Sequence, residues 1–335
     1  MKIFRRWQVI LWMLIPSLTL AQLKHELIDF RFYQQQIFAL DAYSKKVYEF
    51  EKNQLSHTYT LPKAYKLYAI AAPANQSHLY IADGAKHVFV IDAAQHLLRD
   101  RVSNKPEANN RQAPGLMIAS PDGQSVYVAD AYGQMDEPAF LHTIDARTDS
   151  VVNIAIKPHG AYGSYFGWRD GGITINAKGT KIYLTSVYDD GIYRFDTELN
   201  EFSIIRNFPD YHFIDLALAA DQQQLFALTD RAVFTIDLAS GQTKYLFKGN
   251  IGYQQFIYAA PLKRLFILDT CQQKIIVINE KGDLLKEIGL AGDLRKMHMD
   301  ALKNKLYVLD NLTQAIHVID MKSLQPQTSI TLPLN

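Results

Sequence analysis

The segment Val126-Tyr127-Val128-Ala129-Asp130 decides the fold, because its pattern of an apolar residue, an aromatic residue and two further apolar or small residues before a polar end occurs seven times. The other copies are Ile37-Phe38-Ala39-Leu40-Asp41, Leu79-Tyr80-Ile81-Ala82-Asp83, Ile182-Tyr183-Leu184-Thr185-Ser186, Leu225-Phe226-Ala227-Leu228-Thr229, Leu265-Phe266-Ile267-Leu268-Asp269 and Leu306-Tyr307-Val308-Leu309-Asp310. Their aromatic residues follow one another at intervals of 42, 47, 56, 43, 40 and 41 residues. A period of about forty residues built from short strands is typical of a β-propeller with one blade per repeat.

Each copy is followed by a second apolar run that ends on an acid or its amide, such as Ile144-Asp145 or Ile278-Asn279. In the unit 115–156 we expect four strands, at 116–119, 126–130, 141–145 and 151–156, with a tight turn at Ser120-Pro121-Asp122-Gly123. A first strand at 26–32 and a last strand at 328–332 would let the ring close without a borrowed strand; a register shifted by one strand is the alternative. The sequence therefore predicts an all-β, seven-bladed β-propeller of four-stranded antiparallel blades.

Residues 1–21 have the three parts of a secretory signal peptide. Lys2, Arg5 and Arg6 give a positive start, an apolar stretch follows, and Ala21 provides a small residue at the exit. The apolar stretch is shorter than the roughly twenty residues that a spanning helix needs. We predict cleavage after Ala21, which leaves 22–335 as a single periplasmic domain, and the alternative is an uncleaved anchor. A single cysteine, Cys271, cannot form an internal disulfide, which fits a bacterial periplasm.

Composition argues against several classes of partner. The 35 basic and 34 acidic residues nearly cancel, and the predicted signal peptide removes three of the basic ones. This balance favours neither nucleic acid nor membrane insertion of the mature chain. The sequence also lacks the Gly-x-Ser-x-Gly elbow, haem-attachment, His-Glu-x-x-His, calcium-loop and phosphate-loop motifs. We therefore predict no cofactor and no metal.

The acidic residues that end the repeated strands are expected to belong to the scaffold, because an aspartate at a strand end commonly accepts hydrogen bonds from the next turn. The set comprises Asp41, Asp83, Asp130, Asp269 and Asp310 after the first run, and Asp92, Asp145, Asp196, Asp237 and Asp320 after the second. The segment Met297-His298-Met299-Asp300 carries soft ligands compatible with copper. Methionines at alternate strand positions are more often core residues, and we favour that interpretation.

These motifs resemble the YVTN-repeat propellers, the periplasmic family that includes YncE-like proteins. The second strand of that repeat reads apolar-Tyr-Val-Ala-Asn, close to residues 126–130, and its third strand resembles Phe89-Val90-Ile91-Asp92 and His317-Val318-Ile319-Asp320. The resemblance covers the mature chain and is strongest in blades 2, 3 and 7. The long excursion inside blade 3 is also similar to the propeller subunit of bacterial amine dehydrogenases, which would imply a non-catalytic subunit that docks to a cofactor-bearing one.

Three insertions account for the two long spacings: 101–114, 131–139 and 157–171. Strand direction alternates in a blade, so the turns between strands 2 and 3 and those between blades emerge on one face. All three insertions fall on that face and neighbour one another, which is typical of an elaborated functional surface. We call it the insertion face.

Aromatic and basic residues concentrate in the third insertion, and aromatic side chains are frequent anchors in recognition sites. The candidate binding residues are His159, Tyr162, Tyr165, Phe166, Trp168, Arg169 and Asp170, together with Arg111 and His212. Around the central channel we expect Lys66, Gln254, Arg295 and Lys296 on the same face. Their positive charge favours an anionic ligand or an acidic protein surface. Aromatic residues that close the crevice between blades 3 and 4, and a solvated rim, are the structural alternatives.

The sequence therefore favours a secreted binding or scaffold protein without catalysis of its own, which recognises a protein partner or a small anionic or aromatic ligand on the insertion face. The alternative is an enzyme acting at the channel mouth, a lactonase-like hydrolase or an oxidoreductase component. A perturbed histidine beside a carboxylate at the channel mouth would favour the enzyme. A purely structural envelope protein is the third possibility.

Overall fold

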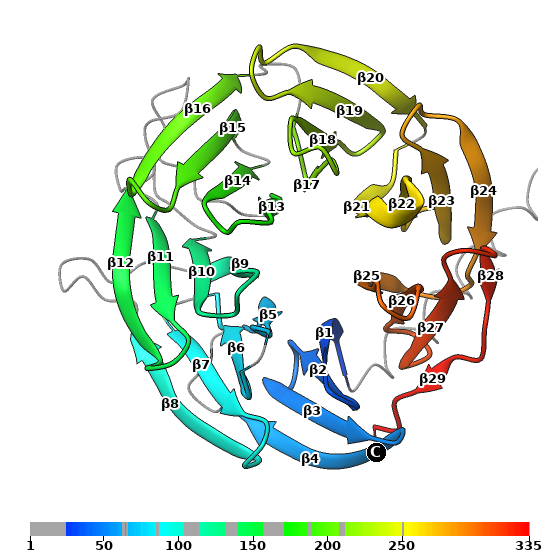
Figure 1. Ribbon diagram of the computed structural model, residues 1–335. Coiled ribbons are helices and arrows are strands. Elements are labelled where there is room, and N and C mark those ends of the chain that lie inside the picture. The colour runs from blue at the N-terminus through cyan, green and yellow to red at the C-terminus, as the bar shows by residue number, and fades with distance from the viewer. Residues whose placement is uncertain are drawn as a thin grey trace, which may run out of the picture.

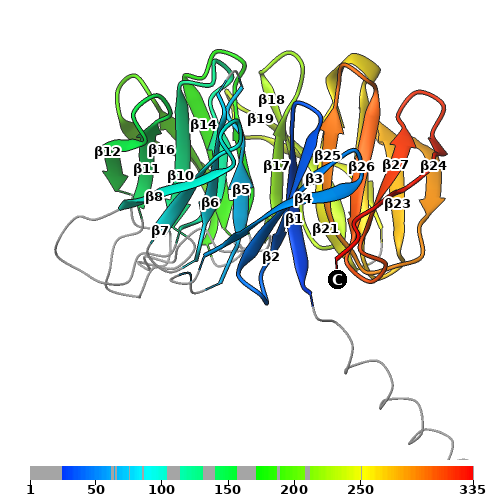
Figure 2. The same cartoon turned by 90° about the horizontal axis from the view of Figure 1, so that it is seen from below.

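The structure is a computed structural model that describes residues 25–61, 64, 66–74, 76–84, 87–103, 114–130, 140–156, 171–186, 189–207, 212–249 and 251–334. It is a ring of seven antiparallel sheets, as Figure 1 shows along the ring axis and Figure 2 from the side. The prediction of a seven-bladed propeller is confirmed. Among the described residues, no helix combines the length and the apolar character needed to cross a bilayer.

The blades follow one another in chain order, and each runs from its innermost to its outermost strand. Blade 1 consists of β1 (Leu27–Tyr33), β2 (Gln36–Asp41), β3 (Lys46–Glu51) and β4 (Gln54–Thr60). Blade 2 consists of β5 (Ala69–Ala71), β6 (His78–Ala82), β7 (His87–Asp92) and β8 (Leu97–Ser103). Blade 3 consists of β9 (Pro114–Ala119), β10 (Ser125–Asp130), β11 (Phe140–Asp145) and β12 (Ser150–Ile156). Blades 4 and 5 consist of β13 (Ile173–Ile175), β14 (Lys181–Ser186), β15 (Asp189–Asp196) and β16 (Glu201–Asn207), and of β17 (Asp215–Leu218), β18 (Gln224–Leu228), β19 (Ala232–Asp237) and β20 (Thr243–Lys248).

Blade 6 consists of β21 (Tyr253–Ala259), β22 (Arg264–Asp269), β23 (Lys274–Asn279) and β24 (Leu284–Gly289), with a short 3-10 helix, η1 (Ala260–Leu262), between its first two strands. Blade 7 consists of β25 (Leu294–Asp300), β26 (Lys305–Asp310) and β27 (Ala315–Asp320), and its outer strand is divided into β28 (Gln325–Pro326) and β29 (Ile330–Thr331). Both short strands pair with β27. The predicted last strand at 328–332 therefore corresponds to β29 alone.

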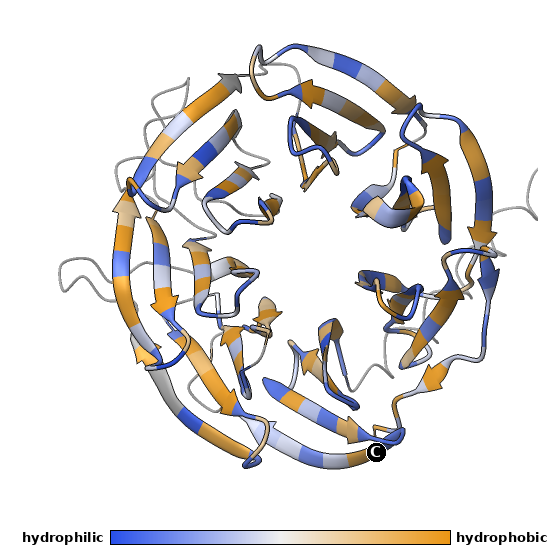
Figure 3. Cartoon of the chain, viewed as in Figure 1, coloured by the Kyte–Doolittle hydropathy of each residue, from blue (hydrophilic) through white to orange (hydrophobic). Residues whose placement is uncertain are grey.

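The core lies between the blades. Seven apolar clusters of described residues each join two adjacent sheets, and together they cover every interface of the ring. Apolar residues recur along the strands all around the ring (Figure 3), as expected for sheets that are covered on both faces. The aromatic residues of the repeat belong to these clusters, and Phe38, Tyr80 and Phe266 are fully buried.

The ring closes between blade 7 and blade 1 without exchange of a strand. The amide of Leu27 donates a hydrogen bond of 2.7 Å to the side-chain oxygen of Asn311, which lies 284 residues further along the chain. Leu27, Phe30 and Leu309 lie in one cluster at this interface, together with Leu332 near the C-terminus. The expected closure is confirmed, and the shifted register is excluded.

The aspartates that end the second strands of the blades hold the turns beside them, as predicted. The fully buried carboxylate of Asp41 accepts hydrogen bonds from the amides of Glu26, Tyr43 and Ser44. Those of Asp83, Asp130, Asp269 and Asp310 likewise accept amide hydrogen bonds, from His87, Phe140, Gln272 and Leu312 among others. The aspartates that end the third strands bond the turns on the opposite face, at Asp92, Asp145, Asp196, Asp237 and Asp320.

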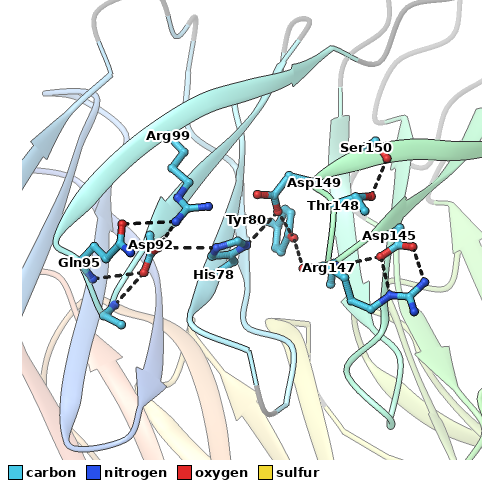
Figure 4. A network of polar contacts seen from close by, with 12 residues as sticks. His78, Tyr80, Asp92, Gln95, Arg99, Asp145, Arg147, Thr148, Asp149 and Ser150 are labelled. Atoms are coloured by element: carbon cyan, nitrogen blue, oxygen red, sulfur yellow. Dashed lines mark hydrogen bonds and ion pairs between the residues drawn. The ribbon is translucent and has the colours of Figure 1, made fainter.

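On the face opposite the insertions, a polar network joins blades 2 and 3 (Figure 4). His78 Nδ1 lies 2.9 Å from Asp149 Oδ1, and the buried Tyr80 hydroxyl donates a 2.5 Å hydrogen bond to the same oxygen. Burial is the main cause that raises the pKa of Tyr80 above its ordinary value, and the hydrogen bond to Asp149 adds to it. The phenol therefore stays protonated and acts as a donor between the blades.

We expect Tyr80→Phe to lower the free energy of unfolding by about 1 to 2 kcal/mol, because it removes a buried hydrogen bond to a carboxylate. Tyr307→Phe is the matched control: it occupies the same place in its repeat, but its hydroxyl makes no hydrogen bond with a described residue. Urea unfolding of both variants measures the difference. Equal losses would show that the Tyr80 hydrogen bond contributes nothing.

Candidate functional site

The innermost strands carry an unusual distribution of polar residues at equivalent positions. In each blade, one inner-strand residue stands opposite the residue that precedes the polar end of the second strand. These seven positions are Asp29, Ala69, Leu116, Gly172, Asp215, Gln255 and Lys296. Blades 2 to 4 thus contribute small or apolar residues, and blades 5, 6, 7 and 1 contribute polar ones. We call Asp29, Asp215, Gln255 and Lys296 the axial arc.

The axial arc lies at the insertion face, because these positions are at the beginning of the inner strands and the inner strands start on that face (Figures 1 and 2). In blades 1, 6 and 7 the register of the inner strand shifts just before Asp29, Gln255 and Lys296. Bulges of this kind re-aim side chains and are frequent next to functional sites. The inner strands of blades 1, 6 and 7 therefore depart from regular strand pairing at these residues.

Side chains of the arc bond the inner strand of the following blade. Asp215 accepts a 3.0 Å hydrogen bond from the amide of Phe256. Gln255 bonds both the amide and the carbonyl of Met297, at 2.7 and 3.2 Å. An inner strand presents an unpaired edge toward the ring axis, and these side chains satisfy part of it.

A second layer lies two residues further along the inner strands and contains Arg31 and His298. His298 Nε2 lies 2.8 Å from Asp29 Oδ1, and His298 Nδ1 lies 3.1 Å from Arg31 Nη1. Arg31 Nη1 also contacts His298 Nε2, so the imidazole meets both the Arg31 guanidinium and the Asp29 carboxylate. Arg31 also donates a 2.9 Å hydrogen bond to Asp29, which is almost fully buried.

Burial and neighbouring charges determine which groups of this layer are ionised. Burial and the Arg31 guanidinium lower the pKa of His298 to about 4, although Asp29 acts in the opposite direction. Burial alone would raise the pKa of Asp29, but Arg31 and His298 outweigh it and hold that pKa well below its usual range. At neutral pH the layer is therefore an Asp29–Arg31 ion pair beside a neutral imidazole.

The carboxyl group of Asp215 differs from that of Asp29, because no cationic side chain among the described residues forms an ion pair with it. Burial raises the pKa of its carboxyl to about 6, and the positive charge of Lys296 counteracts this only in part. Gly172 allows blade 4 to approach the inner strand of blade 5 closely, because a Cβ at Gly172 would lie 2.6 Å from Asp215 Cα. A half-buried carboxyl that titrates near neutral pH can bind a ligand or exchange a proton with one.

Of the sequence-predicted binding residues, the structure describes His212 alone, which is exposed and precedes β17. His159, Tyr162, Tyr165, Phe166, Trp168, Arg169, Asp170 and Arg111 lie outside the described residues. For the insertion 101–114 the ends are corrected: 101–103 belong to β8 and 114 begins β9, so the connection between the two strands is 104–113. Lys66 and Gln254 are exposed, and Arg295 pairs with Asp293 at 2.7 Å.

The two methionines of the segment 297–300 belong to the core, which is the interpretation that the sequence favoured. Met297 is fully buried in the cluster between blades 6 and 7, and Met299 packs against the same cluster. His298 points instead to Asp29 and Arg31. Within the described ranges, no three His, Cys, Asp or Glu side chains lie close enough together to hold a metal ion.

Sequence reasoning included Lys296 but missed Asp29, Arg31 and Asp215, and it named the exposed Gln254 in place of Gln255. The signal for Asp29 and Asp215 was available in the repeat: when the first strands are aligned by their pairing to the repeated motif, their shared position is apolar or small in blades 2 to 4 and polar elsewhere. The short inner strands, of three or four residues in blades 2, 4 and 5, made that alignment hard to see.

Comparisons with known proteins bear on the fold. A scan against models of protein families and a search of curated proteins found no match. Among solved structures, hydrazine synthase of Kuenenia stuttgartiensis is similar with a TM-score of 0.62 and 18% identity, over 80% of each chain. A catalytically inactive virginiamycin B lyase of Staphylococcus aureus, determined with quinupristin, has a TM-score of 0.68 and 13% identity, over 87% of this chain and 94% of the lyase. At these identities the likeness shows that this chain shares the β-propeller fold.

Proposed function

We propose that this protein is a periplasmic binding propeller of the YVTN-repeat kind that recognises a small ligand on its insertion face, over the axial arc. The observation that carries the proposal is the division of the inner ring, with four polar residues on consecutive blades and small or apolar residues on the other three. A scaffold of repeats has no need for such asymmetry. Asp215, Gln255 and Lys296 are half-buried, which favours a small ligand over the flat surface of a protein partner.

The three insertions support this assignment because their described flanks, in β8 to β13, lie at the same end of the ring. We propose that Tyr165, Trp168 and Arg169 of the third insertion also contribute to the binding site. The periplasmic location rests on the predicted signal peptide and on the resemblance to YVTN-repeat proteins.

The test is to express the tagged mature chain, 22–335, in its own periplasm and to identify what co-purifies by mass spectrometry of metabolites and proteins. Two variants are compared with it: Lys296→Met, and the triple change Tyr165→Ala, Trp168→Ala, Arg169→Ala. Lys322→Met is the control, since Lys322 is an exposed lysine in the turn after β27 on the opposite face. We expect a small molecule that both site variants lose and the control retains. Identical profiles for all four proteins would refute the proposal.

A second candidate function is catalysis at the same place. The perturbed histidine expected of an enzyme is present as His298, but both of its ring nitrogens are engaged by Asp29 and Arg31. Asp215, with a pKa raised to about 6, is the better general acid or base. The similar lyase structure makes virginiamycin B a reasonable substrate to assay beside a panel of lactones. Turnover by the wild type that is abolished in Asp215→Asn would establish an enzyme, and absence of turnover would leave the binding function.

A further inference from the structure

Lys296 is the one residue of the axial arc whose side chain makes no hydrogen bond and no ion pair with another described residue. It is half-buried on β25, directly after the register shift at 294–296. Its positive charge reaches Asp29, Asp215 and His298, because it shifts the pKa of each of them. The ammonium group thus lies among the polar groups of the arc with three donors that the described protein does not use.

The two carboxylates near Lys296 are already engaged elsewhere. Asp29 accepts hydrogen bonds from Arg31, His298 and the amide of Phe30. Asp215 accepts the amides of Leu216 and Phe256. Gln255 uses both its oxygen and its nitrogen on Met297. The Lys296 ammonium is therefore available to an acceptor on a ligand.

We infer that the ligand is a small organic anion whose charged group, a carboxylate or a phosphate ester, is held by Lys296 and whose apolar part faces Ala69, Leu116 and Gly172. This inference rests on the proposed binding function and specifies its ligand class. Charge-assisted hydrogen bonds from an ammonium to a carboxylate or phosphate are about twice as strong as neutral ones. The opposite side of the inner ring offers no described charge at the equivalent positions, so it suits the apolar part of the molecule.

Binding of an anion at Lys296 is expected to depend on pH through Asp215. The groups that face Asp215 are the Lys296 charge and the amides of Leu216 and Phe256. As the pH falls through about 6, Asp215 takes up a proton and no longer competes with the ligand for Lys296. His298 stays neutral over this range because its pKa is about 4. Affinity for an anion should therefore rise between pH 7.5 and pH 5.5.

The experiment uses three probes of one size, namely hexanoate, hexylamine and hexanol, titrated into the mature chain and followed by isothermal calorimetry and ligand-observed NMR. We expect hexanoate to bind about tenfold more tightly than the other two, the equivalent of one charge-assisted hydrogen bond. Lys296→Met should lose this preference and Lys322→Met should keep it. Asp215→Asn should bind hexanoate more tightly at pH 7.5 than the wild type and show no rise at lower pH.

The outcomes separate the ligand class from the proposed function. If hexylamine or hexanol binds as well as hexanoate, or if Lys296→Met keeps the preference, the anion inference is wrong. The binding function would then still stand if the site variants lose a co-purifying molecule of another class. If no probe binds and co-purification is also unchanged in the variants, both proposals fail.

Discussion

Replacement of Asp310 by alanine is expected to lower the free energy of unfolding by about 3 to 5 kcal/mol, because it removes a buried carboxylate and leaves its hydrogen-bond donors without an acceptor. The fully buried carboxylate accepts hydrogen bonds from the amides of Asp293 and Leu312 and from the Thr313 hydroxyl, at 2.9, 2.9 and 2.6 Å. His317 Nε2 lies 3.3 Å away. Alanine would leave these donors unsatisfied at the point where the chain enters blade 7.

Asp300→Ala is the control, since Asp300 lies on the opposite face and pairs with the exposed Lys303 at 3.2 Å. Asp300→Ala should lower the free energy of unfolding by about 1 kcal/mol or less. Chemical unfolding at pH 7 measures both variants. If the two changes cost the same, the strand-end aspartates do not hold the blades as we describe.

The isosteric variant Asp310→Asn tests the charge by its pH dependence. Burial raises the pKa of Asp310, but hydrogen bonds from His317, Thr313 and backbone amides outweigh it and lower that pKa to about 2, below the unfolded value of about 4. A lowered pKa stabilises the fold above the unfolded pKa, and the stabilisation disappears as the pH falls toward 2. The difference in stability between wild type and Asp310→Asn should be constant above pH 5 and shrink below pH 4. A difference that does not change with pH would contradict the account.

Gly123→Ala is expected to have the second largest effect, about 2 to 4 kcal/mol, through a contact between blades. Gly123 has a φ of +71°, and a Cβ there would lie 1.8 Å from the carbonyl oxygen of Ala74 in blade 2. Relief of that overlap requires the two blades to move apart at this turn.

Gly179→Ala isolates the contact from the backbone strain. Gly179 has the equivalent place in the first turn of blade 4 and a φ of +75°, but a Cβ there would lie 3.5 Å from Pro121 Cδ, an ordinary distance. Its cost should be about 1 kcal/mol, from the left-handed backbone alone. Thermal unfolding of both variants gives the difference, and equal melting temperatures would show that blade 2 does not press on Gly123.

The repeat predicted the architecture well because a propeller blade is determined by local features. Alternating apolar residues, the turn at 120–123 and the aspartates at strand ends all lie within one unit of about forty residues. The predicted strands of unit 115–156 agree with β9 to β12 to within two residues at each end. The scaffold role of Asp41 and Asp310 followed from the same local reasoning and is confirmed.

The axial arc was harder to predict because it depends on ring closure. Asp29 and His298 are separated by 269 residues and meet only because blade 7 returns to blade 1. Inner strands as short as three residues carry little periodicity, and β5 and β13 have only that length. The sequence showed polar residues such as Lys296, but not which of them share one level of the ring.

The candidate residues of the third insertion stay predictions. His159, Tyr165 and Trp168 lie outside the described residues, so their contribution rests on composition and on the position of the insertion. The neighbouring geometry supplies the place where they would act, at the insertion-face end of the axial arc.

The most direct test of the central claim is the chemical reactivity of Lys296. The mature protein is labelled with an amine-reactive acetylating reagent, with and without the low-molecular-weight fraction of its own periplasm, and the labelling rate of each lysine is measured by mass spectrometry. A ligand over the axial arc predicts slower labelling of Lys296 in the presence of the fraction, with unchanged rates at Lys322 and Lys303 on the opposite face. Equal labelling of Lys296 in both conditions would contradict the assignment of the axial arc as the binding site.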